Sequence, residues 1–111
     1  MKYVLLICDD ETVSPSNEEL ADDPVHQAWA ADLERRGAEI LGIRLRPVVN
    51  ATTVKVRDGE TLVSDGPFAE TKDFVGGVVI IDCADLDEAI EIAAGHPYAR
   101  WGGVEIRPVW E

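Results

Sequence analysis

Basic residues are scarce in this chain of 111 residues: it has 10 Lys and Arg against 22 Asp and Glu, a net charge of −12. Proteins that bind nucleic acids or anionic membranes use clustered Lys and Arg to meet phosphate groups. The shortage therefore predicts no nucleic acid and no membrane among the partners. Nine of the acidic residues fall between Tyr3 and Glu34, a stretch without Lys or Arg. A solvated face explains this stretch most simply, and a basic partner or a metal is the alternative.

Long hydrophobic runs and cysteine pairs are missing as well. The apolar run at residues 3–8 is too short for the core of a signal peptide. No segment approaches the roughly 20 apolar residues that span a membrane. The two cysteines, Cys8 and Cys83, lack metal-ligand spacing, so we expect small core residues with free thiols. We predict a cytoplasmic protein without a metal or other cofactor.

The hydrophobic pattern predicts four strands in one domain that spans residues 1–111. Two continuous apolar runs, Tyr3–Cys8 and Phe74–Ile81, are typical of strands buried on both faces. Two other segments, Ile40–Arg46 and Val104–Val109, alternate apolar and other residues, which indicates strands with one exposed or specialised face. The continuous runs should therefore lie in the centre of a sheet and the alternating segments at its edges.

Two helices are predicted between these strands. The first begins at Asp23-Pro24, with Asp as the N-cap and Pro in the first helical position, and it ends at Gly37. The second begins at Asp85, which together with Glu88 resembles a capping box, and it ends at Gly95. The segment between the first strand and the first helix is predicted to be an acidic loop.

A β-hairpin is predicted over Thr53–Val63. Asp58-Gly59 supplies the two positive-φ positions of a type I′ turn. Counting outward from this turn pairs Arg57 with Glu60 and Val54 with Val63.

The predicted order is strand, helix, strand, hairpin, strand, helix, strand. A ferredoxin-like sheet has the order 4-1-3-2, in which the first and third strands are central. The pattern above assigns centre and edge in the same way, so we predict a ferredoxin-like α+β fold with an inserted hairpin. Because both helices must cover one face of the sheet, the other face stays open unless a second copy covers it. We therefore predict a homodimer.

The segment at residues 65–72 reads D-G-P-F-A-E-T-K. Together with A-T-T-V-K-V-R-D-G at residues 51–59 and V-E-I-R-P-V-W-E at the end, it resembles the DGPF branch of the YCII-related (YciI-like) proteins. The resemblance covers nearly the whole chain. It implies a ferredoxin-like fold that dimerises into an α+β barrel.

The resemblance also implies two kinds of function. Some YCII-like proteins resemble small-molecule enzymes, including a dehydrochlorinase of chlorinated aromatic breakdown, with a His–Asp pair as the active centre. Many members of the DGPF branch are encoded beside extracytoplasmic-function sigma factors, which implies a regulatory role instead.

Two residues of this chain match the His–Asp pair. His26 lies in the first turn of the first predicted helix, and Asp65 opens the D-G-P-F segment. A carboxylate that accepts one imidazole N–H leaves the other nitrogen free as a general base. The alternatives are that His26 is a surface residue and that Asp65 only forms a turn. We expect His96, beyond the second helix, to cap the negative end of that helix as a cation.

Five further residues are candidates for ligand binding. Arg44 and Arg46 share one strand face, which is either an anion pocket or a solvated edge that its charges protect. Phe68 is expected to form a hydrophobic wall, and Glu70 to position Lys72 or a donor on the ligand.

These residues together predict a protein that binds a small organic molecule in a cleft between the first helix and the barrel. Arginines facing the cleft would favour an anionic molecule, and a His26–Asp65 pair would turn it over. The alternative is a non-catalytic binding or regulatory module associated with extracytoplasmic-function sigma factors.

Overall fold

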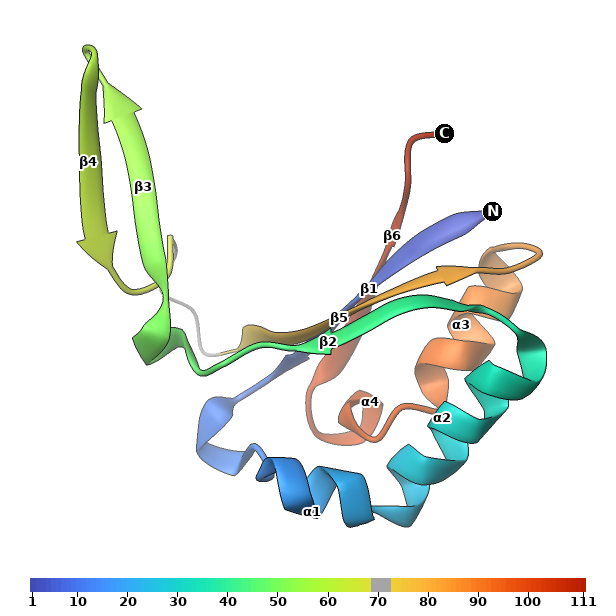
Figure 1. The fold of residues 1–111 in the computed structure, drawn as a ribbon. Coiled ribbons are helices and arrows are strands. Elements are labelled where there is room, and N and C mark those ends of the chain that lie inside the picture. The colour runs from blue at the N-terminus through green and yellow to red at the C-terminus, as the bar shows by residue number, and fades with distance from the viewer. Residues whose placement is uncertain (69–72) are drawn as a thin grey trace.

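The computed structural model, which describes residues 1–68 and 73–111, has two antiparallel sheets (Figure 1). The strands are β1 (Lys2–Asp9), β2 (Glu39–Arg44), β3 (Thr52–Arg57), β4 (Glu60–Asp65), β5 (Phe74–Asp82) and β6 (Gly103–Pro108). The helices are α1 (Asn17–Asp22), α2 (Pro24–Arg36), α3 (Leu86–Ala94) and α4 (Tyr98–Trp101), with 3₁₀ turns at Glu11–Val13 and Val48–Asn50.

The four-stranded sheet has the order β2-β5-β1-β6, and every neighbouring pair is antiparallel. This confirms the predicted order, because β1 and β5 are central and β2 and β6 are edges. The mixed α+β architecture is compatible with a ferredoxin-like fold. Pro108, which cannot donate a ladder hydrogen bond, lies in the edge strand β6.

The core lies between this sheet and the helices, which cover one of its faces (Figure 1). Its strand residues alternate along β1 and β5, and its helix residues come mainly from α2 and α3. The buried hydrophobic residues are Tyr3, Leu5, Ile7, Trp29, Leu33, Ala38, Val79, Ile81, Cys83, Ala89, Ile92, Ala93 and Tyr98. The Trp29 indole N–H donates to the carbonyl of Ile92 at 2.9 Å, which joins α2 to α3 across the core.

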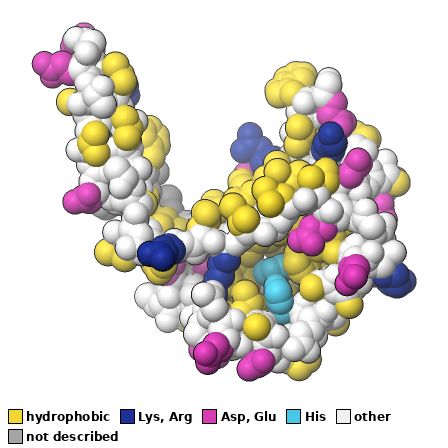
Figure 2. Space-filling view, in the orientation of Figure 1, with side chains coloured by type: hydrophobic (Ala, Val, Ile, Leu, Met, Phe, Trp, Pro, Cys, Tyr) yellow, Lys and Arg dark blue, Asp and Glu magenta, His cyan; other side chains and the backbone are white. Residues whose placement is uncertain are grey.

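Burial of β1 differs from the prediction. Its residues alternate between buried and half-buried, so within one chain only the helix-facing side is fully covered. The helix-free face carries the apolar side chains of Val4, Leu6, Leu41, Ile43, Val78 and Ile80, which the strand register places together. We call this group the open face. Figure 2 shows a band of hydrophobic atoms along this side of the sheet.

The helix starts were predicted well. Asp23 accepts a hydrogen bond from the Val25 N–H, Pro24 begins α2, and Gly37 ends it with a φ of 63°. At α3, Asp85 accepts from the Glu88 N–H as expected. The Glu88 carboxylate, however, accepts from the Ala84 N–H at 2.8 Å rather than from the N-cap residue itself.

The prediction of an acidic loop before α2 was incomplete, because this segment contains the six-residue helix α1. Ser16 caps it by accepting from the Glu19 N–H, and the Glu19 carboxylate accepts from the Ser16 N–H. This is a capping box, a sequence signal that was present at Ser16–Glu19. The helix has no fully buried residue, so the hydrophobic pattern did not reveal it.

The hairpin β3–β4 confirms the predicted turn and register. Asp58 and Gly59 have φ values of 51° and 78°, and Arg57 pairs with Glu60 as Val54 pairs with Val63. We call residues 52–65 the arm. Figure 1 shows that the arm stands away from the main body and extends to the side of the sheet opposite the helices.

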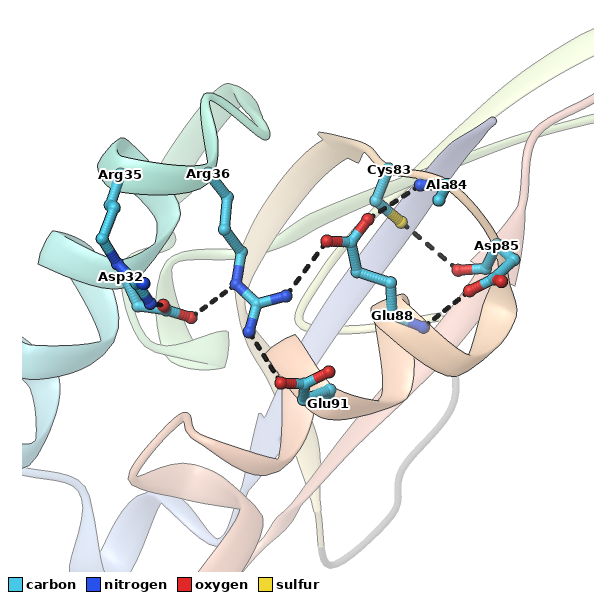
Figure 3. Close-up of polar contacts among 8 residues, drawn as sticks. All are labelled: Asp32, Arg35, Arg36, Cys83, Ala84, Asp85, Glu88 and Glu91. Carbon is cyan, nitrogen blue, oxygen red and sulfur yellow. Dashed lines mark hydrogen bonds and ion pairs between the residues drawn. The ribbon is translucent and has the colours of Figure 1, made fainter.

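An arginine on α2 ties the two long helices together on the outside (Figure 3). The Arg36 guanidinium donates from Nε to Asp32 at 2.8 Å, from Nη1 to Glu88 at 3.0 Å and from Nη2 to Glu91 at 2.9 Å. The hydrogen bond from Arg36 is the main reason that the pKa of Asp32 is lowered. Arg36 therefore reinforces, at the surface, the contact between α2 and α3 that Trp29 makes in the core.

Cys8 and Cys83 are free thiols, as predicted. Cys8 lies near the end of β1, while Cys83 follows the end of β5, and these strands run antiparallel. None of the described helices has the length and apolar character needed to cross a membrane.

Gly102, just before β6, provides a test of the packing at the end of β1. A Cβ atom added there would lie 2.0 Å from the carbonyl oxygen of Cys8, whereas one added at Gly103 would meet nothing within 4 Å. We expect Gly102→Ala to lower the free energy of unfolding by about 3 kcal/mol or more. Urea denaturation of both variants measures this, and similar stabilities of Gly102→Ala and the control Gly103→Ala would contradict the packing.

Candidate functional site

A hollow of about 280 Å³ lies between the helices and the β2–β5 side of the sheet. Its walls are mostly apolar, with several polar side chains at one end. The lining residues are Ile7, Leu20, His26, Trp29, Ala30, Glu39, Gly42, Ile43, Arg44, Gly76, Gly77, Val79, His96 and Tyr98. Figure 2 shows histidine side chains inside this hollow, below the edge of the sheet.

Four aromatic side chains line one wall in a continuous series. His26 lies in the first turn of α2 and Trp29 in the next, while His96 and Tyr98 flank the start of α4. The ring centroids are 5.7 Å apart for His26 and His96, 4.7 Å for Trp29 and His96, and 5.3 Å for His96 and Tyr98. Each of these three pairs packs edge to face, a favourable geometry that fixes ring orientation.

His96 is deeply buried in the wall of the hollow, with only 5% of its surface exposed. Its Nδ1 accepts a hydrogen bond from the Tyr98 N–H at 3.1 Å, which requires an unprotonated nitrogen at that position. Burial lowers the pKa of His96 to about 4, with a further lowering by His26 and an opposing effect of Asp23. His96 is therefore neutral at neutral pH.

This corrects the prediction that His96 caps α3 as a cation. The backbone N–H of His96 does donate to the Ala93 carbonyl at the end of α3. The side chain, however, lines the hollow and accepts a hydrogen bond from the N–H of Tyr98, the first residue of α4. Its burial arises from contacts with Trp29 and Tyr98, which no local pattern in the sequence indicates.

Arg44 joins the hollow to the loop before α1. Its Nη1 donates to Asn17 Oδ1 at 2.6 Å, and its Nη2 donates to the Pro15 carbonyl at 2.6 Å and to the Tyr98 hydroxyl at 3.2 Å. Burial raises the pKa of Tyr98, and the neighbouring Arg44 opposes this increase. Arg44 thus holds the loop, and it also lines the hollow from the helix-facing side of β2.

Beside it, a second hollow of about 600 Å³ is lined by both Arg44 and Arg46. The two predicted arginines are therefore close to one another. Asp9 also lines this space, is almost fully buried, and accepts a hydrogen bond from the Ser14 hydroxyl at 2.5 Å. Sequence reasoning missed Asp9, although an acidic residue directly after a buried strand was a signal.

The remaining predicted site residues lie elsewhere in the single chain. Asp65 ends β4 in the arm, outside the hollow that contains His26, so the structure does not bring this pair together within one chain. Phe68 is 75% exposed, and the Lys55 ammonium lies 5.1 Å from its ring centroid. Glu70 and Lys72 fall outside the described residues.

The buried neutral state of His96 predicts a pH dependence of stability. In the unfolded chain this histidine binds a proton near pH 6.5, but in the folded protein only near pH 4. The unfolded state therefore binds more protons between these values, and stability is lost as the pH falls through them. We expect this residue to account for about 2 kcal/mol of stability lost between pH 7 and pH 5.

Urea denaturation at pH 7, 6 and 5 measures this loss. The decrease should be about 2 kcal/mol larger in the wild type than in His96→Gln, because other groups contribute equally to both proteins. The control His26→Gln should keep most of the decrease, since burial is the main cause of the shifted pKa. Parallel curves for the wild type and His96→Gln would show that the imidazole is not buried as described.

The chain is similar to known proteins over its full length. The family model for the YCII-related domain matches residues 1–111. An uncharacterized protein of Rhizobium meliloti is 39% identical over 115 residues, which cover 98% of this chain and 92% of that protein. A lycopene beta-cyclase of Paracoccus sp. is 35% identical over 65 residues, which cover 56% of this chain but only 17% of that protein. Because the family match spans the whole chain, this protein belongs to the YCII-related family.

Proposed function

We propose that the hollow binds a small organic molecule and that His26 takes up a proton from it during turnover. The observation that carries this proposal is a pair of imidazoles in one hollow with unlike surroundings. His26 is half-buried, whereas His96 is buried and neutral. Two titratable groups in unlike environments commonly take different roles in acid–base catalysis. The apolar walls, including Trp29 and Val79, suit an organic molecule.

An anionic group on this molecule would be recognised by Arg44. The contacts that the structure records use three of the five N–H donors of its guanidinium, which leaves capacity for a ligand. Asp65 would assist His26 only if a second copy or a movement of the arm brought it to the hollow. The pairing of His26 with Asp65 therefore remains a prediction.

Membership of the DGPF branch and a homodimer that forms an α+β barrel are part of the same proposal. Support for the dimer comes from the open face, on which Leu41 is 47% and Ile43 48% exposed. The arm adds a second argument, because an isolated two-stranded hairpin is marginally stable in water and its valines Val54, Val56 and Val63 are exposed. A second copy would cover both surfaces.

Replacing Leu41 by lysine tests the dimer. A charge on the open face would have to be buried in the interface, so Leu41→Lys should shift the protein towards the monomer. The control Ile90→Lys changes a residue of α3 that is 49% exposed and lies on the helix side, and it should remain dimeric. Light scattering should give twice 12.1 kDa for the wild type and the control. A wild-type monomer at micromolar concentration would contradict the proposal.

Ligand binding is tested by filling the hollow. Both Ala30 and Ala31 of α2 are exposed, but only Ala30 lines the hollow. A metabolite library screened by thermal shift should give compounds that stabilise the wild type and Ala31→Phe but not Ala30→Phe. At 100 times its Kd, such a compound contributes about 2.7 kcal/mol to stability. Equal responses of the two variants would place the binding site elsewhere.

The same compounds separate the enzyme from the alternative, a binding or regulatory module. An enzyme should convert a bound compound and lose turnover in His26→Gln, with the fold intact. If Asp65 acts with His26, Asp65→Asn should lose turnover to a similar extent. Binding without conversion in the wild type would favour the regulatory module.

A further inference from the structure

The ring of His96 is held in one orientation by contacts from three sides. The Tyr98 N–H bonds Nδ1 at 3.1 Å, and the rings of Trp29 and Tyr98 stand nearly perpendicular to it, at interplanar angles of 82° and 79°. His26 contacts it from α2 at 88°. A group fixed in this way does not have to reorganise when a ligand arrives, which increases the value of any hydrogen bond that it donates.

The free donor of this ring is Nε2–H. A neutral imidazole carries one N–H, and because Nδ1 accepts a hydrogen bond, the hydrogen is on Nε2. Among the described residues, every buried side-chain nitrogen and oxygen has a hydrogen-bond partner. The hydrogen bond recorded for the His96 ring involves Nδ1, and no described residue is recorded as a partner of Nε2. Nε2 must therefore reach accessible surface, and the hollow is the space that His96 lines.

The Nε2–H of His96 faces a hollow that is lined mostly by apolar side chains. Ile7, Trp29 and Val79 line the hollow together with His96, so a ligand there would leave most of its contact with water. An uncharged donor in such surroundings matches an uncharged acceptor oxygen, because an anion in the hollow would pair with the charged Arg44 instead. The ketone, aldehyde, ester or amide oxygen has this property.

We propose that His96 donates its Nε2–H to the oxygen of a small carbonyl compound bound in the hollow. The inference rests on the small-molecule function proposed above and adds the chemical class of the ligand. It also assigns a role to each imidazole. When a C–H bond next to the carbonyl breaks, the proton goes to His26 and the electron pair moves onto the oxygen that His96 holds. The proton can return to the substrate, so the step needs no oxidant or reductant.

Three probes of similar shape test this donor at pH 7: benzamide with a carbonyl oxygen, toluene with no acceptor, and benzoate with an anionic one. In NMR titrations of the full-length protein, benzamide should shift the Nε2 resonance of His96. His96→Leu should weaken benzamide binding about tenfold, the value of one neutral hydrogen bond, and leave toluene binding unchanged. His96→Gln, which can accept from Tyr98 and still donate to a ligand, should restore most of the loss.

The outcomes separate this inference from the proposed function. Benzamide binding that His96→Leu leaves unchanged but Ala30→Phe abolishes would overturn the role of His96 and keep the hollow as a binding site. Failure of both benzamide and toluene to bind the wild type at millimolar concentration would overturn both. Benzoate binding that exceeds benzamide binding and is lost in Arg44→Gln, but not in His96→Leu, would assign recognition to Arg44 and overturn the inference.

If His96→Leu also loses toluene, the hollow has collapsed in that variant. The wild-type spectrum then decides, because a bound carbonyl must move the Nε2 resonance of His96. An Nε2 resonance that stays in place while benzamide saturates the protein would overturn the inference.

Discussion

The two long helices cover the same face of the four-stranded sheet, and most other features depend on this constraint. The covered face supplies the hydrophobic core, in which β1, β5, α2 and α3 meet. The other face keeps its apolar residues exposed or half-buried, and the arm extends to that side (Figure 1). A single chain therefore buries one face of the sheet in its core and leaves apolar side chains of the other face partly exposed to solvent.

The hollow lies between α2 and the part of the sheet formed by β2 and β5. The Trp29 indole donates to the Ile92 carbonyl and Arg36 bridges to α3, and these contacts hold α2 against its neighbour. Towards the start of α2, the opposing strands carry glycine at Gly42 and Gly77, which leave space where side chains would otherwise fill the gap. The histidines border this space, so the packing that shapes the hollow also places its polar groups.

The fold was more accessible to prediction from the sequence than the site. Strand order followed from two continuous apolar runs, and the hairpin register followed from the turn residues Asp58 and Gly59. These are local or periodic signals, and backbone geometry relates them directly to turns and strands. The site depends on which side chains meet across the fold, and composition does not contain that information. His26 was named as a candidate site residue, and it lines the hollow. His96 was assigned to a helix end instead, because its burial arises from contacts with α2 and α4.

The difference between local signals and contacts across the fold also explains the outcome of the predictions for Arg44 and Asp65. Alternation placed Arg44 and Arg46 on one strand face, but β2 ends at Arg44, and only the second hollow joins the two residues. The pattern also did not show that Arg44 would bind the loop before α1. Asp65 was joined to His26 by resemblance, and the distance between the arm and α2 in one chain is a property of the tertiary structure alone (Figure 1). Contacts between copies would be equally invisible in the sequence.

The proposed chemistry of the hollow depends on a fixed, neutral imidazole at His96. Long-range proton–nitrogen NMR spectra recorded from pH 7 to pH 5 test it most directly, because they distinguish protonated from unprotonated ring nitrogens. We expect His96 to remain neutral at pH 5, with the hydrogen on Nε2 and an unprotonated Nδ1, as a pKa of about 4 requires. A midpoint close to 6.5, the ordinary value, or a hydrogen on Nδ1 of the neutral ring would contradict it.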